Sequence, residues 1–112
     1  MLNTYDSQFY LGSLILCVEY LHKNNIIYRD IKPENIMVDD KGFVKLIDMG
    51  TAKILKNKGG RTHTIIGTPH YMAPEILNGK GYTFSVDLWS IGICLYEFMC
   101  GCVPYAEDAD DP

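Results

Sequence analysis

The sequence lacks the cysteine pairs and clustered ligands that mark small metal-binding domains. Its four cysteines, Cys17, Cys94, Cys100 and Cys102, form no C-x-x-C pair. The three histidines are not spaced to complete a metal site either, so a structural zinc centre is not expected. No signal-peptide pattern precedes the cysteines. We therefore expect reduced, mostly buried thiols in a cytoplasmic protein.

Positive charge is also scarce, with 10 Lys and Arg against 14 Asp and Glu and a formal net charge of -4. Binding a phosphate backbone needs a basic face, so nucleic acid is not an expected partner. The longest apolar stretch, residues 86–101, is interrupted by Asp87 and Glu97. It is shorter than the ~20 residues that a membrane span needs, so no span is predicted.

What is present is the composition of a globular chain. Hydrophobic residues make up 47% of the 112 positions, which excludes disorder over the whole length. This length suits one compact domain or a piece of a larger one. There is no internal repeat and no low-complexity tract.

The order of apolar residues predicts helix, hairpin, long loop and helix. Residues 7–25 carry apolar side chains at helical spacing. A short strand is expected at 26–28, and the β-rich runs 35–38 and 43–47 flank "DDKG", where Gly42 suits a hairpin turn. Residues 49–82 show no sustained period and are expected to form one long loop. A helix is predicted over 86–100, with Ser85 as its N-cap and Gly101 at its end, apolar all round and buried on all sides.

A polar cluster, "YRDIKPEN", stands between the first strand and the hairpin. On one tight loop, Asp30 can accept the proton of a hydroxyl, and Lys32 can neutralise developing negative charge. Asn35 offers a neutral oxygen to a hard cation, and the hairpin returns Asp48 to its side, as a Mg²⁺ site requires. Taken singly, each residue is better explained as a turn cap or a solvated surface group than as part of a site. Their common register favours a site.

Four motifs resemble, in order and spacing, those of eukaryotic protein kinases: "YRDIKPEN", "DMG", "GTPHYMAPE" and "DLWSIG". The lysine two places after Asp30, and "GTP" before "APE", are typical of serine/threonine kinases. "YRD" and the flanking residues resemble the AGC group, most of all cGMP-dependent protein kinases. The resemblance implies an α+β kinase-like fold, of which residues 1–112 are the central part of the mainly helical C-terminal lobe.

The resemblance also implies roles for individual residues in a complete kinase. Asp30 is then the catalytic base and Lys32 contacts the transferred phosphate, with Thr68 touching both. ATP and Mg²⁺ are the implied cofactors, and cGMP would bind outside this chain. The implied metal ligands are Asn35 and Asp48, and the other implied nucleotide-site residues are Met37, beneath the adenine, and Glu34.

The resemblance further suggests regulation and substrate class. Thr64 lies in the long loop, and a phosphate there would be clamped by Arg29 and Lys53. Glu34 and Glu97 match positions that meet an arginine before the target residue, so protein substrates basic around the target Ser/Thr are expected. Three structural residues complete the pattern: Asp87, which shapes the catalytic loop, and Trp89 and Glu75.

The sequence also departs from the family pattern. No G-x-G-x-x-G occurs, and the lysine-bearing strand and the hinge of the nucleotide-binding lobe are missing. Met49 stands where the family usually has phenylalanine. Because methionine is apolar and adaptable, we expect the packing at this position to be kept. Two hypotheses remain open: a partial catalytic domain of an active kinase, or a chain that acts alone as a non-catalytic binding or decoy module. As an isolated chain, we expect poor folding or aggregation.

Overall fold

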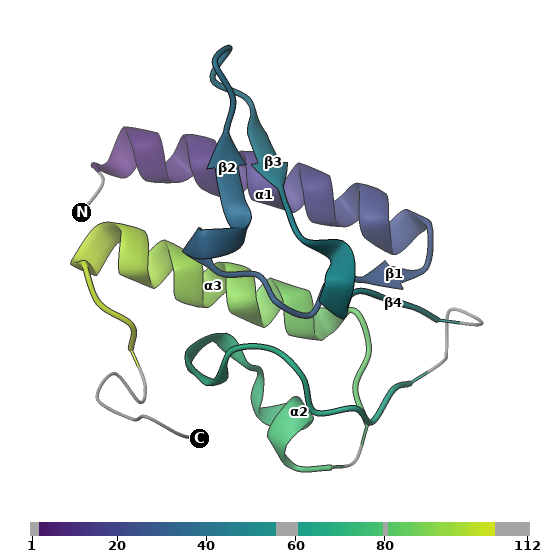
Figure 1. Ribbon diagram of the computed structural model, residues 1–112. Helices are drawn as coiled ribbons and strands as arrows, with labels where there is room; N and C mark the ends of the chain where they lie inside the picture. Colours follow the sequence, from purple (N-terminus) through teal and green to yellow (C-terminus); the bar gives the residue numbers. More distant parts are fainter. Residues whose placement is uncertain (1–2, 56–60, 80, 105–112) are drawn as a thin grey trace.

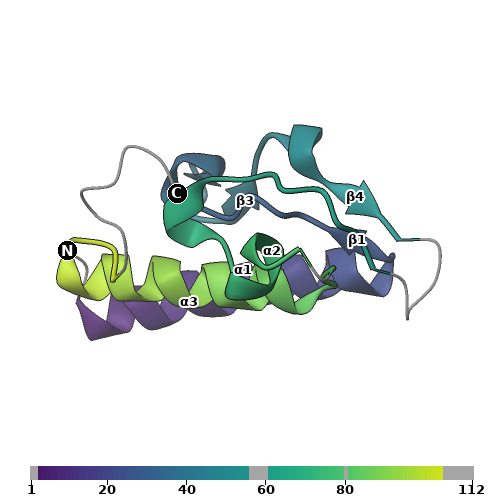
Figure 2. The ribbon, with the colours of Figure 1, turned by 90° about the horizontal axis from the view of Figure 1, so that it is seen from below.

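The computed structural model describes residues 3–55, 61–79 and 81–104. Two long helices, α1 (Thr4–Lys23) and α3 (Ser85–Cys100), lie side by side and run antiparallel (Figure 1). The strands and the connecting segments lie on one side of this helix pair, as the view from below shows (Figure 2). The helices thus form one layer, and the polar loop of the sequence lies in the other.

Helix α1 confirms the predicted first helix and begins three residues earlier than expected. Asn3 is its N-cap, and its side-chain oxygen accepts a hydrogen bond of 2.8 Å from the amide of Asp6. The helix ends at Lys23, with Asn24 as its C-cap. Leu14 and Val18 are fully buried against α3, as the predicted apolar face requires.

Helix α3 confirms the predicted final helix, but two details of the prediction were wrong. Ser85 is the first helical residue and not the N-cap, a place that Phe84 takes without a side-chain hydrogen bond. The helix is also not buried on all sides, because Leu88 is 55% exposed and other apolar residues of the same face are open. At its end Gly101 adopts φ 82° and closes the helix, as expected.

The predicted hairpin is formed by β2 (Ile36–Val38) and β3 (Val44–Leu46), which pair antiparallel with Met37 opposite Lys45. Asp39 closes the turn, since its side chain accepts the amides of Lys41 and Phe43, each at 2.9 Å. These hydrogen bonds, that of the Phe43 amide foremost, lower the pKa of the Asp39 carboxyl.

The prediction of a single element-free loop over 49–82 was wrong. Strand β4 (Lys53–Ile54) pairs antiparallel with β1 (Ile26–Ile27), and the short helix α2 (Pro74–Leu77) follows later. Single-turn 3-10 helices also occur at Pro33–Asn35, Met49–Thr51 and Pro69–Tyr71. These elements are too short to produce a detectable period. Residues 56–60 and 80 of the predicted loop lie outside the described residues.

Two apolar clusters hold the layers together. One joins α1 and α3 to the polar loop through Tyr28, Ile31 and Cys94; the other joins β1 to the region around α2 through Ile27 and Ile76. Trp89, half-buried, packs against both clusters. The polar loop is therefore anchored from beneath by fully buried side chains on either side of Asp30.

The expectation of mostly buried thiols was wrong as well. Cys94 is the one fully buried cysteine of the four, whereas Cys17 and Cys102 are half-buried and Cys100 is exposed. Burial, followed by the nearby charges of Glu97 and Glu34, raises the pKa of the Cys94 thiol to about 12. Cys94 is thus a neutral core side chain.

Candidate active site

Asp30 lies at the centre of a hydrogen-bonded network of polar side chains. Its Oδ1 accepts a hydrogen bond of 3.0 Å from the hydroxyl of Thr68, and its Oδ2 lies 3.6 Å from the Nζ of Lys32. Lys32 in turn donates to the Thr68 hydroxyl at 2.7 Å. The Asp30 side chain is 12% exposed and that of Lys32 is 22% exposed, so both charged groups are largely buried but still reach solvent.

Asn35 ends the 3-10 turn Pro33–Asn35 and completes this network from below. Its amide nitrogen donates to the backbone oxygen of Asp30 at 2.8 Å and to the Asp30 carboxylate at 3.2 Å. Because the nitrogen end faces Asp30, the carbonyl oxygen is the end of this amide that can serve a hard cation. The residue is buried, so its orientation is fixed by the loop.

The hairpin brings Asp48 to the same end of the site. The amide of Ile47 donates to the backbone oxygen of Asn35 at 2.9 Å, and Asp48 is the next residue. Asp48 adopts a left-handed backbone, φ 62° and ψ 86°, and its Oδ1 accepts from the Gly50 amide at 3.0 Å. A non-glycine residue in this region is strained, and such strain is concentrated at functional sites.

Tyr28 ties the loop to the hairpin. Its hydroxyl donates to the backbone oxygen of Ile47, beside Asp48. Burial is the main cause that raises the pKa of the Tyr28 phenol to about 12, and carboxylates near the ring add to it. They belong to Asp30, Asp48 and Asp87. The negative charges of Asp30 and Asp48 therefore both act on the Tyr28 phenol.

The amide and carboxylate oxygens of Asn35 and Asp48 fit a magnesium ion. Mg²⁺ takes few protein oxygens, keeps several waters and binds substrate phosphates through its remaining positions. The described residues contain no group of three or more His, Cys, Asp or Glu side chains suited to a metal. A two-oxygen site that is completed by phosphates is consistent with that finding.

Asp87 supports the loop from α3. Its side chain has no exposed surface, and its two oxygens accept the amides of Tyr28 and Arg29, each at 2.8 Å. Arg29 has φ 74°, a conformation that these contacts stabilise. Since Arg29 precedes Asp30 directly, the buried carboxylate controls the backbone that carries Asp30.

The structure connects Arg29 to the predicted phosphosite and places Lys53 on β4. Arg29 donates to the backbone oxygen of Thr51 at 2.6 Å and to the hydroxyl of Tyr82 at 3.4 Å. Tyr82 in turn donates to the backbone oxygen of Thr64, whose side chain is exposed. Lys53 lies exposed on β4, and no contact between it and Thr64 appears within residues 3–55, 61–79 and 81–104.

The two carboxylates expected to recognise substrate charge both influence Tyr71, and Glu97 contacts it directly. The Tyr71 hydroxyl donates to Glu97 on α3. Burial first, then the Glu97 hydrogen bond and the charges of Glu97 and Glu34, raise the pKa of Tyr71. Glu34 is exposed beside Lys32, and Met37 is 52% exposed on β2. Glu75 is half-buried at the start of α2.

The sequence reasoning missed three residues that shape the site. His22 contacts Asp87, Tyr82 links Arg29 to Thr64, and Gly67 lies against the polar loop at Arg29. At Gly67 φ is +117°, and an added Cβ would lie 2.7 Å from the backbone oxygen of Arg29. The glycine of "GTP" was the sequence signal that could have identified Gly67. No spacing in the sequence marks the other two.

The protein kinase domain family model matches residues 1–112, and the chain belongs to that family. Within it, the chain is 58% identical over 111 residues to the cGMP-dependent protein kinase of Eimeria tenella, which covers 99% of this chain and 11% of that protein. It is 56% identical over 111 residues to the cGMP-dependent protein kinase of Plasmodium berghei, a match that covers 99% of this chain and 13% of that protein.

A more distant relative gives a reference for these values. The cAMP-dependent protein kinase catalytic subunit of Dictyostelium discoideum is 44% identical over 102 residues, covering 91% of this chain and 15% of that protein. The chain thus spans between about a tenth and a sixth of the length of these curated relatives. None of the helices in the described part of the chain has the length and apolar character of a membrane span.

Proposed function

We propose that the complete protein carrying this segment transfers the γ-phosphate of ATP to serine or threonine hydroxyls of protein substrates. The convergence of Asp30, Lys32 and Thr68 carries this proposal, because it joins a base and a cation at one partly open point. Relatives named cGMP-dependent protein kinase and serine/threonine-protein kinase support it.

In this proposal Asp30 orients the attacking hydroxyl and accepts its proton. The positive charge of Lys32 lies beside the transferring phosphoryl group and stabilises the negative charge that develops there. Thr68 holds both side chains in register through its hydroxyl. Phosphoryl transfer depends chiefly on such positioning and charge stabilisation, so a rigid polar network suits it.

Asn35 and Asp48 are the proposed ligands of Mg²⁺, which, when bound, neutralises phosphate charge. Met37 and Glu34 are proposed to contact the nucleotide from β2 and from the 3-10 turn before it. The test is the Mg²⁺ dependence of transfer by a complete kinase containing this segment. Asp48→Asn should raise the Mg²⁺ needed for half-maximal rate at least tenfold, while Asp40→Asn, in the hairpin turn, should not. An unchanged requirement in the first variant would remove Asp48 from the site.

Regulation is proposed to act through Thr64 and through cGMP bound outside this chain. A phosphate on Thr64 brings close to two negative charges and would lie near the Arg29 guanidinium, which Tyr82 already connects to Thr64. Lys53 would complete the clamp from β4. The similarity of this chain to cGMP-dependent protein kinases supports the proposed regulation by cGMP. Equal turnover of Thr64→Ala and unchanged protein would dispose of the phosphosite.

The substrates are proposed to be basic around the target residue, because Glu34 and Glu97 place two carboxylates near Tyr71. We also propose a cytoplasmic location, in keeping with the free thiols of Cys17, Cys94 and Cys100. Substituting the arginines of a basic peptide substrate by alanine should then raise its KM. A KM that stays the same would exclude these carboxylates as specificity residues.

A second candidate function is that of a non-catalytic binding module. The observation that favours it is the open apolar face of α3, on which Leu88, Tyr96 and Met99 are each more than 40% exposed. The coding sequence upstream of Met1 separates the two candidates. A glycine-rich loop and a lysine-bearing strand found there would support phosphotransfer, whereas their absence would favour the binding module.

A further inference from the structure

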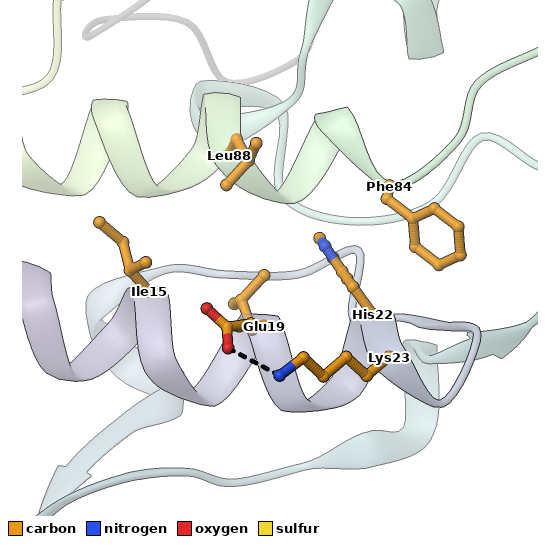
Figure 3. Close-up of a pocket in the computed structure, with 7 residues that line it drawn as sticks. Ile15, Glu19, His22, Lys23, Phe84 and Leu88 are labelled. Atoms are coloured by element: carbon orange, nitrogen blue, oxygen red, sulfur yellow. Dashed lines mark ion pairs between the residues drawn. The ribbon is translucent and has the colours of Figure 1, made fainter.

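Two thiols lie on either side of the glycine that ends α3. Cys100 is the last residue of that helix and is exposed, and Cys102 is half-buried. The helix starts at Ser85, beside a groove of about 550 Å³ between α1 and α3. Ile15 and Leu88 are among the seven residues that line this groove, and none of the seven is a cysteine (Figure 3). The thiol pair is therefore a separate feature of the opposite end of α3.

The conformation of Gly101 brings the two cysteines together. It has φ 82° and ψ 0°, and its amide donates to the backbone oxygen of Glu97 at 2.8 Å. In the body of a helix, side chains two residues apart point to opposite sides. With standard bond lengths, the left-handed Gly101 places the Cα atoms of Cys100 and Cys102 about 5 Å apart and turns both Cβ atoms toward the same side. Disulfides join Cα atoms about 4.4–6.8 Å apart, so this turn already has the required spacing.

The two other cysteines differ in their surroundings. Cys94 is fully buried, and burial raises the pKa of its thiol to about 12, so it remains a neutral core side chain. Cys17 is half-buried on α1 and lines another groove, together with Tyr20 and Met49. Within the described part of the chain, Cys100 and Cys102 are thus the cysteines that share one turn of backbone.

We propose that Cys100 and Cys102 form a reversible redox site, which glutathione disulfide converts from a dithiol to an intrachain disulfide. The exposed Cys100 thiolate attacks one sulfur of the oxidant and releases the first glutathione thiolate. The Cys102 sulfur then attacks the Cys100 sulfur of this mixed disulfide and releases the second. Two protein thiols are oxidised, the disulfide of the oxidant is reduced to two thiols, and the two cysteine protons pass to the released thiolates.

The bond closes a small ring around Gly101 at the surface of the protein. Exposed or strained disulfides have higher reduction potentials than structural ones and are easily reduced. Disulfides of cytosolic proteins are usually transient for the same reason, because glutathione and thioredoxin reduce them. The ring contains the Gly101 amide, which closes α3 on the backbone oxygen of Glu97. Oxidation therefore acts on the final turn of α3, and reduction restores the dithiol.

The test uses a complete kinase containing this segment, equilibrated at a fixed concentration of reduced glutathione with increasing glutathione disulfide. After acid quenching and alkylation of the remaining thiols, cleavage after glutamate releases residues 98–107, which contain both cysteines but not Cys94. Mass spectrometry should show this peptide two hydrogens lighter and without alkyl label, and prior reduction should restore two labels. Cys102→Ser should instead carry one glutathione on Cys100. Cys17→Ser is the matched control and should behave as the unchanged protein.

A comparison with the unfolded protein tests the contribution of the turn. Because the fold already brings the two cysteines together, the native protein should be half-oxidised at roughly tenfold less glutathione disulfide than the protein unfolded in urea. Equal amounts would overturn the role of the Gly101 turn. Single glutathione adducts alone in the unchanged protein, or two alkyl labels at every glutathione ratio, would overturn the site. These results do not depend on whether the protein transfers phosphate.

Discussion

The Nζ of Lys32 lies 2.7 Å from the hydroxyl oxygen of Thr68, 36 residues further along the chain. This contact joins the polar loop after β1 to the segment that leads to α2, and the same hydroxyl donates to Asp30. One small side chain therefore connects the proposed base, the proposed phosphate-contacting lysine and the segment that leads to α2.

Replacing Thr68 by Val removes that hydroxyl while keeping the shape of the side chain. Because Thr68 aligns both charged groups, we expect kcat of a complete kinase containing this segment to fall about 10- to 100-fold. Thr68→Ser retains the hydroxyl and serves as the matched control, with less than about a threefold loss. Steady-state kinetics with a Ser peptide measures both, and a Val variant as active as the Ser variant would refute the role of Thr68.

Replacing Gly67 by Ala tests the close approach between the residues before Thr68 and the polar loop at Arg29. The φ of +117° and the 2.7 Å approach to the Arg29 backbone oxygen leave no room for a Cβ. We expect the substitution to lower the free energy of unfolding by about 1–3 kcal/mol. Gly92→Ala is the control, because a Cβ there meets nothing within 4 Å inside α3 and helix propensity favours alanine. Urea unfolding of a complete kinase containing this segment compares the two variants, and equal midpoints would contradict the geometry.

The Cys94 thiol should be unreactive in the folded chain. Its pKa is raised to about 12 by burial and nearby carboxylates, so the thiolate is nearly absent at pH 8. Exposed Cys100 should be alkylated first, and Cys94 only after denaturation. Mass spectrometry of the labelled protein shows the order, and fast labelling of Cys94 under native conditions would disprove its burial.

The Cys94 thiol should also make the free energy of unfolding decrease at alkaline pH. Its folded pKa of about 12 lies above the ordinary thiol pKa of 9.0, so between these values the unfolded chain loses a proton that the folded chain retains. The contribution is fully present below pH 9 and decreases as pH rises toward 12. Cys94→Ala should flatten the pH profile of the unfolding midpoint above pH 9. An unaltered slope would show that other groups, such as Tyr28, cause it.

The open face of α3 predicts poor behaviour of the 112-residue chain by itself. Leu88 is 55% exposed, and Tyr96 and Met99 are each 44% exposed. Leaving such side chains in water forgoes roughly 1.5–3 kcal/mol each, against a total stability of about 5–15 kcal/mol for a domain. We expect strong binding of a hydrophobic dye and aggregation, both reduced by Leu88→Gln. A sharp two-state melt with little dye binding would contradict this.

The sequence predicted those parts of the fold that have a period or a local turn. Helices α1 and α3 and the hairpin follow from their apolar spacing and from Gly42. Strand β4 and helix α2 were missed because two and four residues cannot show a period. Ser85 was misplaced because a serine before an apolar run is only one of several possible helix starts.

For the candidate site, sequence spacing predicted only the approach of residues that lie close together in the chain. Asp30, Lys32 and Asn35 lie within six positions on one loop, so their approach follows from chain geometry. Residues that join from afar, Thr68 and Asp87, were identified only through resemblance to kinases. The contact of His22 with Asp87 spans 65 positions and depends on how α1 packs on α3, which no local pattern encodes.

The most direct test of the account is phosphate transfer by a complete kinase containing this segment, with and without the Asp30 carboxylate. Labelled γ-phosphate from ATP should appear on a Ser peptide in the presence of Mg²⁺. Asp30→Asn, which keeps the size of the side chain, should lower kcat by roughly 10²–10⁴-fold. Asp40→Asn should leave it unchanged. Transfer by Asp30→Asn at the rate of the unchanged protein would contradict the central claim.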